Sequence, residues 1–251
     1  MLKKITLFFL WITACGFSQC YNGFQIGSYH VVSIKSDGTL WGWGYSDFGQ
    51  LGNTNLMNPI SFQLSPATDW TKVAVSNYNT FIIKNNGTLW AMGDGRFGLL
   101  GNGLTTQINP TLQQIGSATN WQKISASTQM TIGLKSDGTI WGWGQNDQYE
   151  MGNNTCCANQ LTPIQIGTAN HWVDIESTSM GASAFALKND GTIWGWGLNT
   201  AGLLGNSTVM ARSIPTQLNA DTDWASIHVG AAHILALKTN GTLWAWGGGN
   251  M

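Results

Sequence analysis

One pattern of apolar and polar positions recurs five times along the chain, about every 50 residues. Each copy has an apolar run ending in Lys, a polar turn containing Gly, and then Thr and two aromatic or apolar positions, usually Trp, as in Leu134 to Gly144. Asp-Gly and Asn-Gly pairs tolerate the positive φ angles of tight hairpin turns. The pattern therefore predicts five β-hairpins, at residues 34–44, 83–93, 134–144, 187–197 and 237–247.

The second strand of each predicted hairpin separates bulky residues from small ones. Side chains alternate between the two faces of a strand, so Trp41 and Trp43 lie on one face and Gly42 and Gly44 on the other. A sheet with indoles on one face and glycines on the other can stack on a copy of itself. Repetition of that contact predicts an all-β protein, a β-propeller.

Two more strands complete each repeat. The first of these strands precedes each hairpin and begins at an aromatic residue. These residues are Tyr21, Trp70, Trp121, Trp172 and Trp224. The other is a Pro-containing run such as 109–116 or 162–167, and Pro suits an edge strand.

We therefore expect four-stranded blades of about 50 residues, with about four and a half blades in residues 20–251 and an incomplete last repeat. Such a chain predicts an open or truncated ring. An open ring exposes sheet edges and an apolar face, which favours aggregation or pairing with a partner.

The repeats resemble those of the regulator of chromosome condensation family. The last copy carries Trp224–Ile227, Gly230–His233, Ala236–Lys238 and Trp244–Gly247, and the first carries Gly49–Asn53. The resemblance spans essentially everything from Tyr21 onward. It implies a β-propeller, normally of seven blades, that acts as a platform for protein interactions.

Composition and charge argue against nucleic-acid binding. Only 9% of the residues are charged and the formal net charge is −1. The 11 Lys and Arg residues include the five Lys that end the repeated apolar runs. A nucleic-acid interface needs a concentrated basic surface, so we expect no nucleic-acid partner.

Residues 1–19 are typical of a signal peptide, because Lys3 and Lys4 precede the apolar run Ile5–Ala14. That run is too short to span a membrane. Cleavage after Gln19 would give a soluble secreted protein. Cleavage before Cys15 would instead give a lipid-anchored protein, so the expected location is secreted, periplasmic or at the cell surface.

The residue types that carry chemistry have structural explanations here. The repeated Trp columns indicate a packed core, and His30 and His233 share one repeat column, where the family resemblance implies a structural role. Cys156 and Cys157 are adjacent, and adjacent cysteines bridge each other only with strain. We expect no catalytic residue, cofactor or metal site.

The loops that follow each Trp-containing strand vary most between copies, which is typical of binding loops on a repeat scaffold. In the third copy Tyr149 replaces the glycine expected from Gly49 and Gly98. The predicted partner-binding patch consists of Tyr45, Asp47, Arg96, Asp147, Tyr149 and Glu150.

These observations predict a non-enzymatic, exported scaffold that binds a protein through its loops. The resemblance implies two alternatives: an inhibitor of an extracellular enzyme such as a β-lactamase, as in a secreted bacterial propeller, and a guanine-nucleotide exchange factor. An exported protein would not meet a cytosolic GTPase, which disfavours the second. A propeller enzyme is a third alternative, disfavoured because no acid–base or metal cluster stands out.

Overall fold

The structure, a computed structural model, describes residues 21–179, 181–200 and 202–248. The predicted signal peptide, residues 1–19, lies outside the described residues. One short 3₁₀ helix, η1, spans Arg96–Gly98. In the part of the chain that the structure describes, no helix has the length and apolar character needed to cross a membrane.

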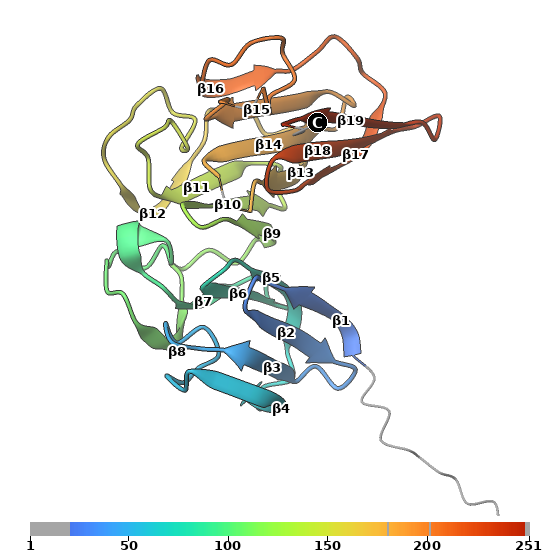
Figure 1. Cartoon of the computed structure of the whole chain (residues 1–251). Coiled ribbons are helices and arrows are strands. Elements are labelled where there is room, and N and C mark those ends of the chain that lie inside the picture. The colour runs from blue at the N-terminus through green and yellow to red at the C-terminus, as the bar shows by residue number, and fades with distance from the viewer. Residues whose placement is uncertain (1–20, 180, 201, 249–251) are drawn as a thin grey trace, which may run out of the picture.

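Five antiparallel sheets, blades 1 to 5, follow one another along an arc (Figure 1). The first strands are β1 (Tyr21–Ile26), β5 (Trp70–Val75), β9 (Trp121–Ala126), β13 (Trp172–Ser177) and β17 (Trp224–Val229). The second strands are β2 (His30–Lys35), β6 (Asn79–Lys84), β10 (Met130–Lys135), β14 (Ser183–Lys188) and β18 (His233–Lys238). The third strands are β3 (Leu40–Tyr45), β7 (Leu89–Gly93), β11 (Ile140–Gly144), β15 (Ile193–Gly197) and β19 (Leu243–Gly247). The fourth strands are β4 (Met57–Ser65), β8 (Asn109–Gln114), β12 (Gln160–Gln165) and β16 (Arg212–Gln217).

The strands run in sequence order from the inside of the arc to the outside. The first strands of neighbouring blades contact one another, since β5 lies beside β1 and β9, and β13 lies beside β9 and β17. Blades 1 to 4 have four strands, and blade 5 has three among the described residues. The prediction of a β-propeller with four-stranded blades is therefore confirmed, and the described sheets form an open arc.

The hairpin turns depend on their glycines. Gly138 has a φ of +78°, and a Cβ atom there would lie 2.2 Å from the carbonyl oxygen of Asn170. Both the backbone angle and the close approach of the next connection exclude a side chain. This turn fixes the pairing of Leu134 with Ile140 and the register of β10 with β11.

A repeated polar relay holds the first Trp of each third strand. In blade 4 the Asp190 carboxylate accepts hydrogen bonds from the backbone and hydroxyl of Thr192, and the Thr192 hydroxyl accepts one from Trp194 Nε1 at 2.8 Å. The Lys188 Nζ lies 3.7 Å from the centroid of the Trp194 ring and 4.9 Å from that of Trp172. A cation over an indole face is stabilising, which gives the repeated Lys a structural role. The Lys of the other four blades lie over Trp41, Trp90, Trp141 and Trp244.

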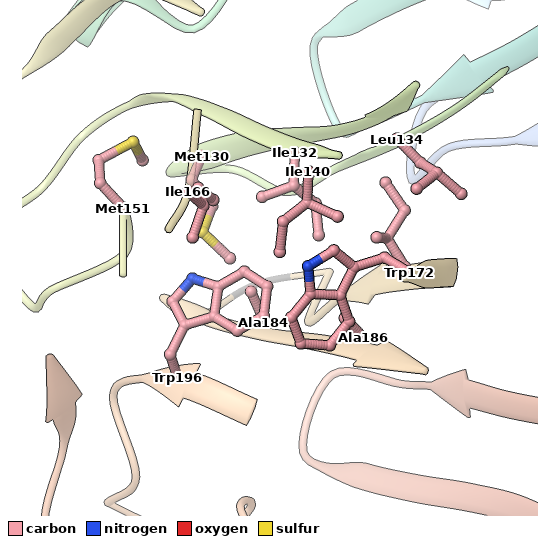
Figure 2. Packing of buried hydrophobic residues seen from close by; sticks show 11 residues of the cluster. Met130, Ile132, Leu134, Ile140, Met151, Ile166, Trp172, Ala184, Ala186 and Trp196 are labelled. Atoms are coloured by element: carbon pink, nitrogen blue, oxygen red, sulfur yellow. The ribbon is translucent and has the colours of Figure 1, made fainter. Parts of the chain in front are cut away.

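The second Trp of the third strand joins one blade to the blade before it. Trp196 of blade 4 is fully buried, and its Nε1 donates a hydrogen bond of 2.9 Å to the carbonyl oxygen of Glu150 in blade 3. Its ring lies against Gly152, where a Cβ would lie 2.8 Å away. Figure 2 shows Trp196 and Trp172 facing Met130 and Ile132 of blade 3. The indole-bearing face of blade 4 thus packs on blade 3 as predicted, but the glycine beneath Trp196 belongs to a loop, and Met151 and Ile166 cover the strand glycine Gly142.

The two Trp columns of the third strand differ in burial, although alternation puts them on the same face. Trp143 and Trp196 are fully buried, whereas Trp141 and Trp194 are half-buried and Trp244 is 52% exposed. The prediction of a single core for all Trp columns is therefore too broad. The indoles of the first column lie against the repeated Lys side chains. The indoles of the second column fill the space between neighbouring blades.

His30 links blades 1 and 2. Its Nε2 lies 3.0 Å from the Thr80 hydroxyl, which in turn donates to the carbonyl oxygen of Gln50. The imidazole must therefore donate from Nε2, and the buried Nδ1 has no hydrogen-bond partner among the described residues. Burial lowers the pKa of His30 to about 4, because a proton on Nδ1 would place an unpaired charge in the interface.

We predict that His30 makes the fold sensitive to acid. Its folded-state pKa lies below the unfolded-state value, so the neutral ring supports folding fully above about pH 6.5, and this support declines as the pH falls towards 4. The loss by pH 4 is about 3 kcal/mol in the free energy of unfolding. Asn79 occupies the position of His30 in blade 2, so His30→Asn places the same residue type in blade 1. The variant should lose the pH-dependent part of the free energy of unfolding that His30 contributes. Denaturant unfolding at several pH values measures it, and parallel curves for the two proteins would contradict the assignment.

Candidate functional site

An aromatic patch lies on the loop face where blades 1 and 2 meet. Tyr29 comes from the β1–β2 turn, Tyr45 ends β3, Phe48 belongs to the loop after β3, and Tyr78 comes from the β5–β6 turn. We call these four rings, together with Arg96 at the start of η1, the aromatic patch. The four aromatic positions are in turns or at a strand end and Arg96 is in the short η1 helix, so the rigid sheets beneath them set their spacing.

The rings of the patch form a continuous series of contacts. Tyr29 and Tyr78 are stacked, with centroids 5.6 Å apart and an interplanar angle of 12°. Tyr45 tilts against Tyr29 at 6.0 Å, and Phe48 tilts against Tyr78 at 4.7 Å. The Arg96 guanidinium lies 5.0 Å from the centroid of Phe48. The patch thus joins side chains from positions 29 to 96 into one surface.

The surface is both accessible and held in place. Tyr29 is 52% exposed and the Arg96 side chain is 42% exposed. Arg96 is fixed by Asp94, a buried carboxylate that accepts hydrogen bonds from Arg96 Nε at 3.0 Å and Nη2 at 2.6 Å. These hydrogen bonds raise the pKa of Arg96 further, so the guanidinium is permanently charged.

Burial and, to a smaller extent, Asp47 raise the pKa values of two phenols in the patch. Partial burial raises the pKa of Tyr45, and the Asp47 carboxylate adds to the rise through its charge and a hydrogen bond. The pKa of Tyr78 is raised by burial first, and then by Tyr29 and Asp47. Both phenols are protonated at neutral pH and use their proton inside the patch, Tyr45 towards Asp47 and Tyr78 towards Tyr29, so their hydroxyl oxygens remain able to accept a hydrogen bond from a bound partner.

The structure brings together half of the predicted site residues. Tyr45, Asp47 and Arg96 belong to one surface, whereas Asp147 and Tyr149 belong to the blade 3 loop. Asp147 accepts a hydrogen bond from Gln145 Nε2. Tyr149 adopts a φ of +64°, the conformation that its counterparts in blades 1 and 2 achieve with glycine.

Glu150 is not a surface residue. Its side chain is fully buried, one carboxylate oxygen accepts a hydrogen bond from the backbone of Gln148, and its carbonyl oxygen receives Trp196. Burial raises its pKa. The prediction that Glu150 belongs to the binding surface is therefore wrong, because the residue lies in the contact between blades 3 and 4.

Sequence reasoning missed Tyr29, Phe48 and Tyr78. Tyr29 and Tyr78 occupy one repeat column, directly before the second strand, and the other blades have Gln129, Ala182 and Ala232 there. Comparison of that column across the five copies would have found the two tyrosines. Phe48 has no comparable signal, since its importance comes from its contact with Tyr78.

A second concave region lies along the inner strands. It is a cavity of about 1010 Å³ whose lining includes Lys123, Glu176 and His228. Lys123 Nζ lies 2.6 Å from an Asp174 oxygen and 2.8 Å from a Glu176 oxygen. Lys123 thus bridges two carboxylates across blades 3 and 4, which leaves one negative charge in excess beside the cavity.

No metal centre is found in residues 21–179, 181–200 and 202–248, where no three His, Cys, Asp or Glu side chains are grouped to hold an ion. Cys156 and Cys157, in the blade 3 loop, are free thiols.

Comparison with known families identifies the repeat. Models of the "Regulator of chromosome condensation (RCC1) repeat" match residues 24–50, 70–99, 137–183 and 190–237, together more than half of the chain.

Relatives and solved structures agree with this match. The chain is 27% identical over 229 residues to the ultraviolet-B receptor UVR8 of Arabidopsis thaliana, covering 86% of this chain and 51% of the receptor. It is 25% identical over 197 residues to the human E3 ubiquitin-protein ligase HERC2, covering 76% of this chain and 4% of the ligase. Human WBSCR16 is similar in structure, with a TM-score of 0.78, 17% identity and coverage of 90% of this chain and 61% of that one. Yeast RCC1 (Prp20), solved bound to Kap60, has a TM-score of 0.76, 22% identity and coverage of 90% and 56%. The chain thus spans about half the length of UVR8 and a small part of HERC2.

We predict that Asp47 controls the ionisation of Tyr45. Asp47→Asn removes the charge that raises the pKa of Tyr45, so this phenol should ionise at lower pH than in the wild type. NMR of ring-labelled tyrosine across an alkaline titration measures the change. Asp147→Asn, in the blade 3 loop, is the matched control and should leave Tyr45 unchanged. A Tyr45 titration identical in all three proteins would contradict the assignment.

Proposed function

Because the chain belongs to the regulator of chromosome condensation (RCC1) repeat family, we propose that it is a non-enzymatic scaffold that binds a protein through its loop face, with the aromatic patch as the main contact. The observation that carries the proposal is the continuous series of rings from Tyr45 to Arg96, supplied by two blades and held on rigid sheets. Tyr and Arg are enriched among the residues that dominate the energetics of protein interfaces.

The chemistry of the patch supports protein recognition. Tyr29 and Tyr78 offer ring faces and hydroxyl groups, and they are already stacked, so little side-chain entropy is lost when a partner covers them. Arg96 adds a fixed positive charge and Asp47 a nearby negative one. A partner therefore meets apolar area, hydrogen-bond donors and both signs of charge within one small surface.

Similar propellers support the same class of function. Yeast RCC1 has been solved bound to Kap60, and another structure of Prp20p from Saccharomyces cerevisiae is described by its binding properties to Gsp1p and histones. At 22% identity these structures share the fold with this chain. They support protein binding as a class of function and leave the identity of the partner of this chain to the experiment below.

Catalysis has weaker support than binding. Asp94 forms an ion pair with Arg96, and Asp174 and Glu176 each form an ion pair with Lys123. His30 is enclosed between two blades. Each of these groups has a structural partner, which favours a scaffold.

We also propose that the protein is exported. The Lys3–Lys4 start and the apolar run that follows support a signal peptide over residues 1–19. N-terminal sequencing and intact mass of the protein expressed in a bacterial host should show cleavage after Gln19, or a lipidated Cys15. A chain retained in the cytoplasm with its N-terminus intact would contradict export.

We predict that Tyr78 is required for partner binding. Wild-type protein serves as bait in affinity capture from the exported fraction of the native source, and the affinity of the captured protein is then measured with purified components. Tyr78→Ala should weaken binding at least about tenfold, as expected for truncation of a central aromatic contact. Gln129→Ala, the equivalent position in blade 3, should leave the affinity unchanged.

Two outcomes separate the alternatives. Equal affinities for the Tyr78 and Gln129 variants would contradict a binding role for the aromatic patch. If the captured protein is an extracellular enzyme, loss of its activity on addition of the propeller would identify an inhibitor, such as the β-lactamase inhibitor considered above.

A further inference from the structure

The loop between β11 and β12 of blade 3 carries two adjacent thiols, Cys156 and Cys157. They are the cysteines of the part of the chain that the structure describes, and both are free. Cys157 is exposed and Cys156 is half-buried. The pair belongs neither to the aromatic patch nor to the buried clusters on either side of blade 3. It therefore forms a separate group of nucleophilic side chains that a reagent in solution can reach.

The backbone turns the two thiols towards each other. Successive side chains of an extended chain point to opposite sides, but Cys157 adopts a φ of +69°. A positive φ is uncommon for a residue with a side chain, and such conformations concentrate at functional sites. The pKa of the Cys157 thiol is raised, first of all by a hydrogen bond with the Cys156 thiol. The two sulfur atoms therefore already lie close together.

Hydrogen bonds around the pair hold this arrangement. The Cys157 N–H donates to the carbonyl oxygen of Asn146 at 2.7 Å, and Asn146 Nδ2 donates to the carbonyl oxygen of Thr155 at 3.1 Å. The Asn154 N–H donates to the carbonyl oxygen of Ser213, in β16 of blade 4, and the Ser213 hydroxyl donates to Asn154 Oδ1, both at 2.8 Å. The loop is thus fixed on two blades, and reacting groups held in place in this way react as though highly concentrated.

A bond between the two sulfur atoms would be strained. The Cα atoms of adjacent residues are about 3.8 Å apart, below the separation of about 4.4–6.8 Å that is usual across a disulfide. Strained and exposed disulfides are easily reduced and are typical of labile or regulatory sites. Proximity favours formation of the bond and strain favours its reduction, which is the balance that a reversible site needs.

We propose that Cys156 and Cys157 form a reversible dithiol–disulfide site whose reaction partner is a small aliphatic disulfide. The exposed Cys157 thiolate attacks one sulfur of that disulfide, which forms a mixed disulfide and releases a first small thiolate. The Cys156 thiolate then attacks the Cys157 sulfur, which forms the protein bond and releases a second small thiolate. The protons of the two protein thiols pass through solvent to the released thiolates. The pair loses two electrons, and the small disulfide gains them.

Mass spectrometry of the full chain treated with oxidised glutathione tests the proposal. The reaction is run in mildly alkaline buffer, because the charges of Asp147 and Glu150 also raise the pKa of Cys157 and so lower its thiolate fraction at neutral pH. After the remaining thiols are alkylated, trypsin releases residues 136–188 as one peptide, whose only cysteines are Cys156 and Cys157. Circular dichroism and thermal melting confirm that each variant is folded.

The wild-type peptide should lose the mass of two hydrogen atoms and keep no glutathione, and an excess of reduced glutathione should restore both thiols. Cys156→Ser should keep glutathione on Cys157, because the thiol that displaces it is gone. Cys157→Ser should take up glutathione more slowly than Cys156→Ser, since Cys156 is half-buried. The opposite order of rates would contradict Cys157 as the attacking thiol.

Three further results would overturn the proposal. A wild-type peptide that stays reduced or keeps glutathione would show that the two sulfur atoms do not join. A cross-link to the peptide that holds Cys20 would show a different pairing. A bond that resists excess reduced glutathione would be a permanent disulfide. Each of these leaves the binding role of the aromatic patch unaffected, because the patch belongs to blades 1 and 2.

Discussion

Three of the four junctions between the described blades depend on one contact: an indole on the third strand of a blade that packs against a glycine in the loop of the preceding blade. Trp143, Trp196 and Trp246 each donate a hydrogen bond of 2.9 Å to a carbonyl oxygen of that loop. The matching glycines are Gly101, Gly152 and Gly205, where a Cβ would lie within 2.6–2.9 Å of the ring. Blade 2 has Met92 instead of Trp, and a Cβ on its counterpart Gly52 would lie 3.9 Å from the Met92 sulfur. The contact therefore combines shape and hydrogen bonding, and the smaller side chain leaves room opposite it.

The junction that carries the binding surface lacks this indole. Blades 1 and 2 meet with Met92 in place of Trp. There the stacking of Tyr29 on Tyr78 and the linkage of His30 to Thr80 join the two blades, and they bring turns that are far apart in sequence to defined distances. Recognition chemistry on the loop face thus rests on the packing between sheets.

The sequence was sufficient to predict the local structure and the class of fold. The Asx-Gly turns, the alternation of Trp with Gly and the repeat length lead to four-stranded blades, and the structure has them. Burial within one strand face was beyond reach, because alternation treats Trp141 and Trp143 alike and only the neighbouring blade distinguishes them. Only half of the candidate site could be predicted from the sequence, for the same reason. Variation between loops pointed to Tyr45, Asp47 and Arg96, but the contact of Phe48 with Tyr78 and the burial of Glu150 arise only when two blades pack together.

A double-mutant cycle between Gly152 and Trp196 tests this packing contact most directly. Gly152→Ala introduces backbone strain and a clash with the ring, whereas in a Trp196→Met background only the backbone strain remains, as the pairing of Gly52 with Met92 indicates. The free energies of unfolding of the wild type, the two single variants and the double variant should give a coupling of about 1 kcal/mol or more, with the double variant less destabilised than the sum. Additivity of the two substitutions, within about 0.3 kcal/mol, would contradict the account.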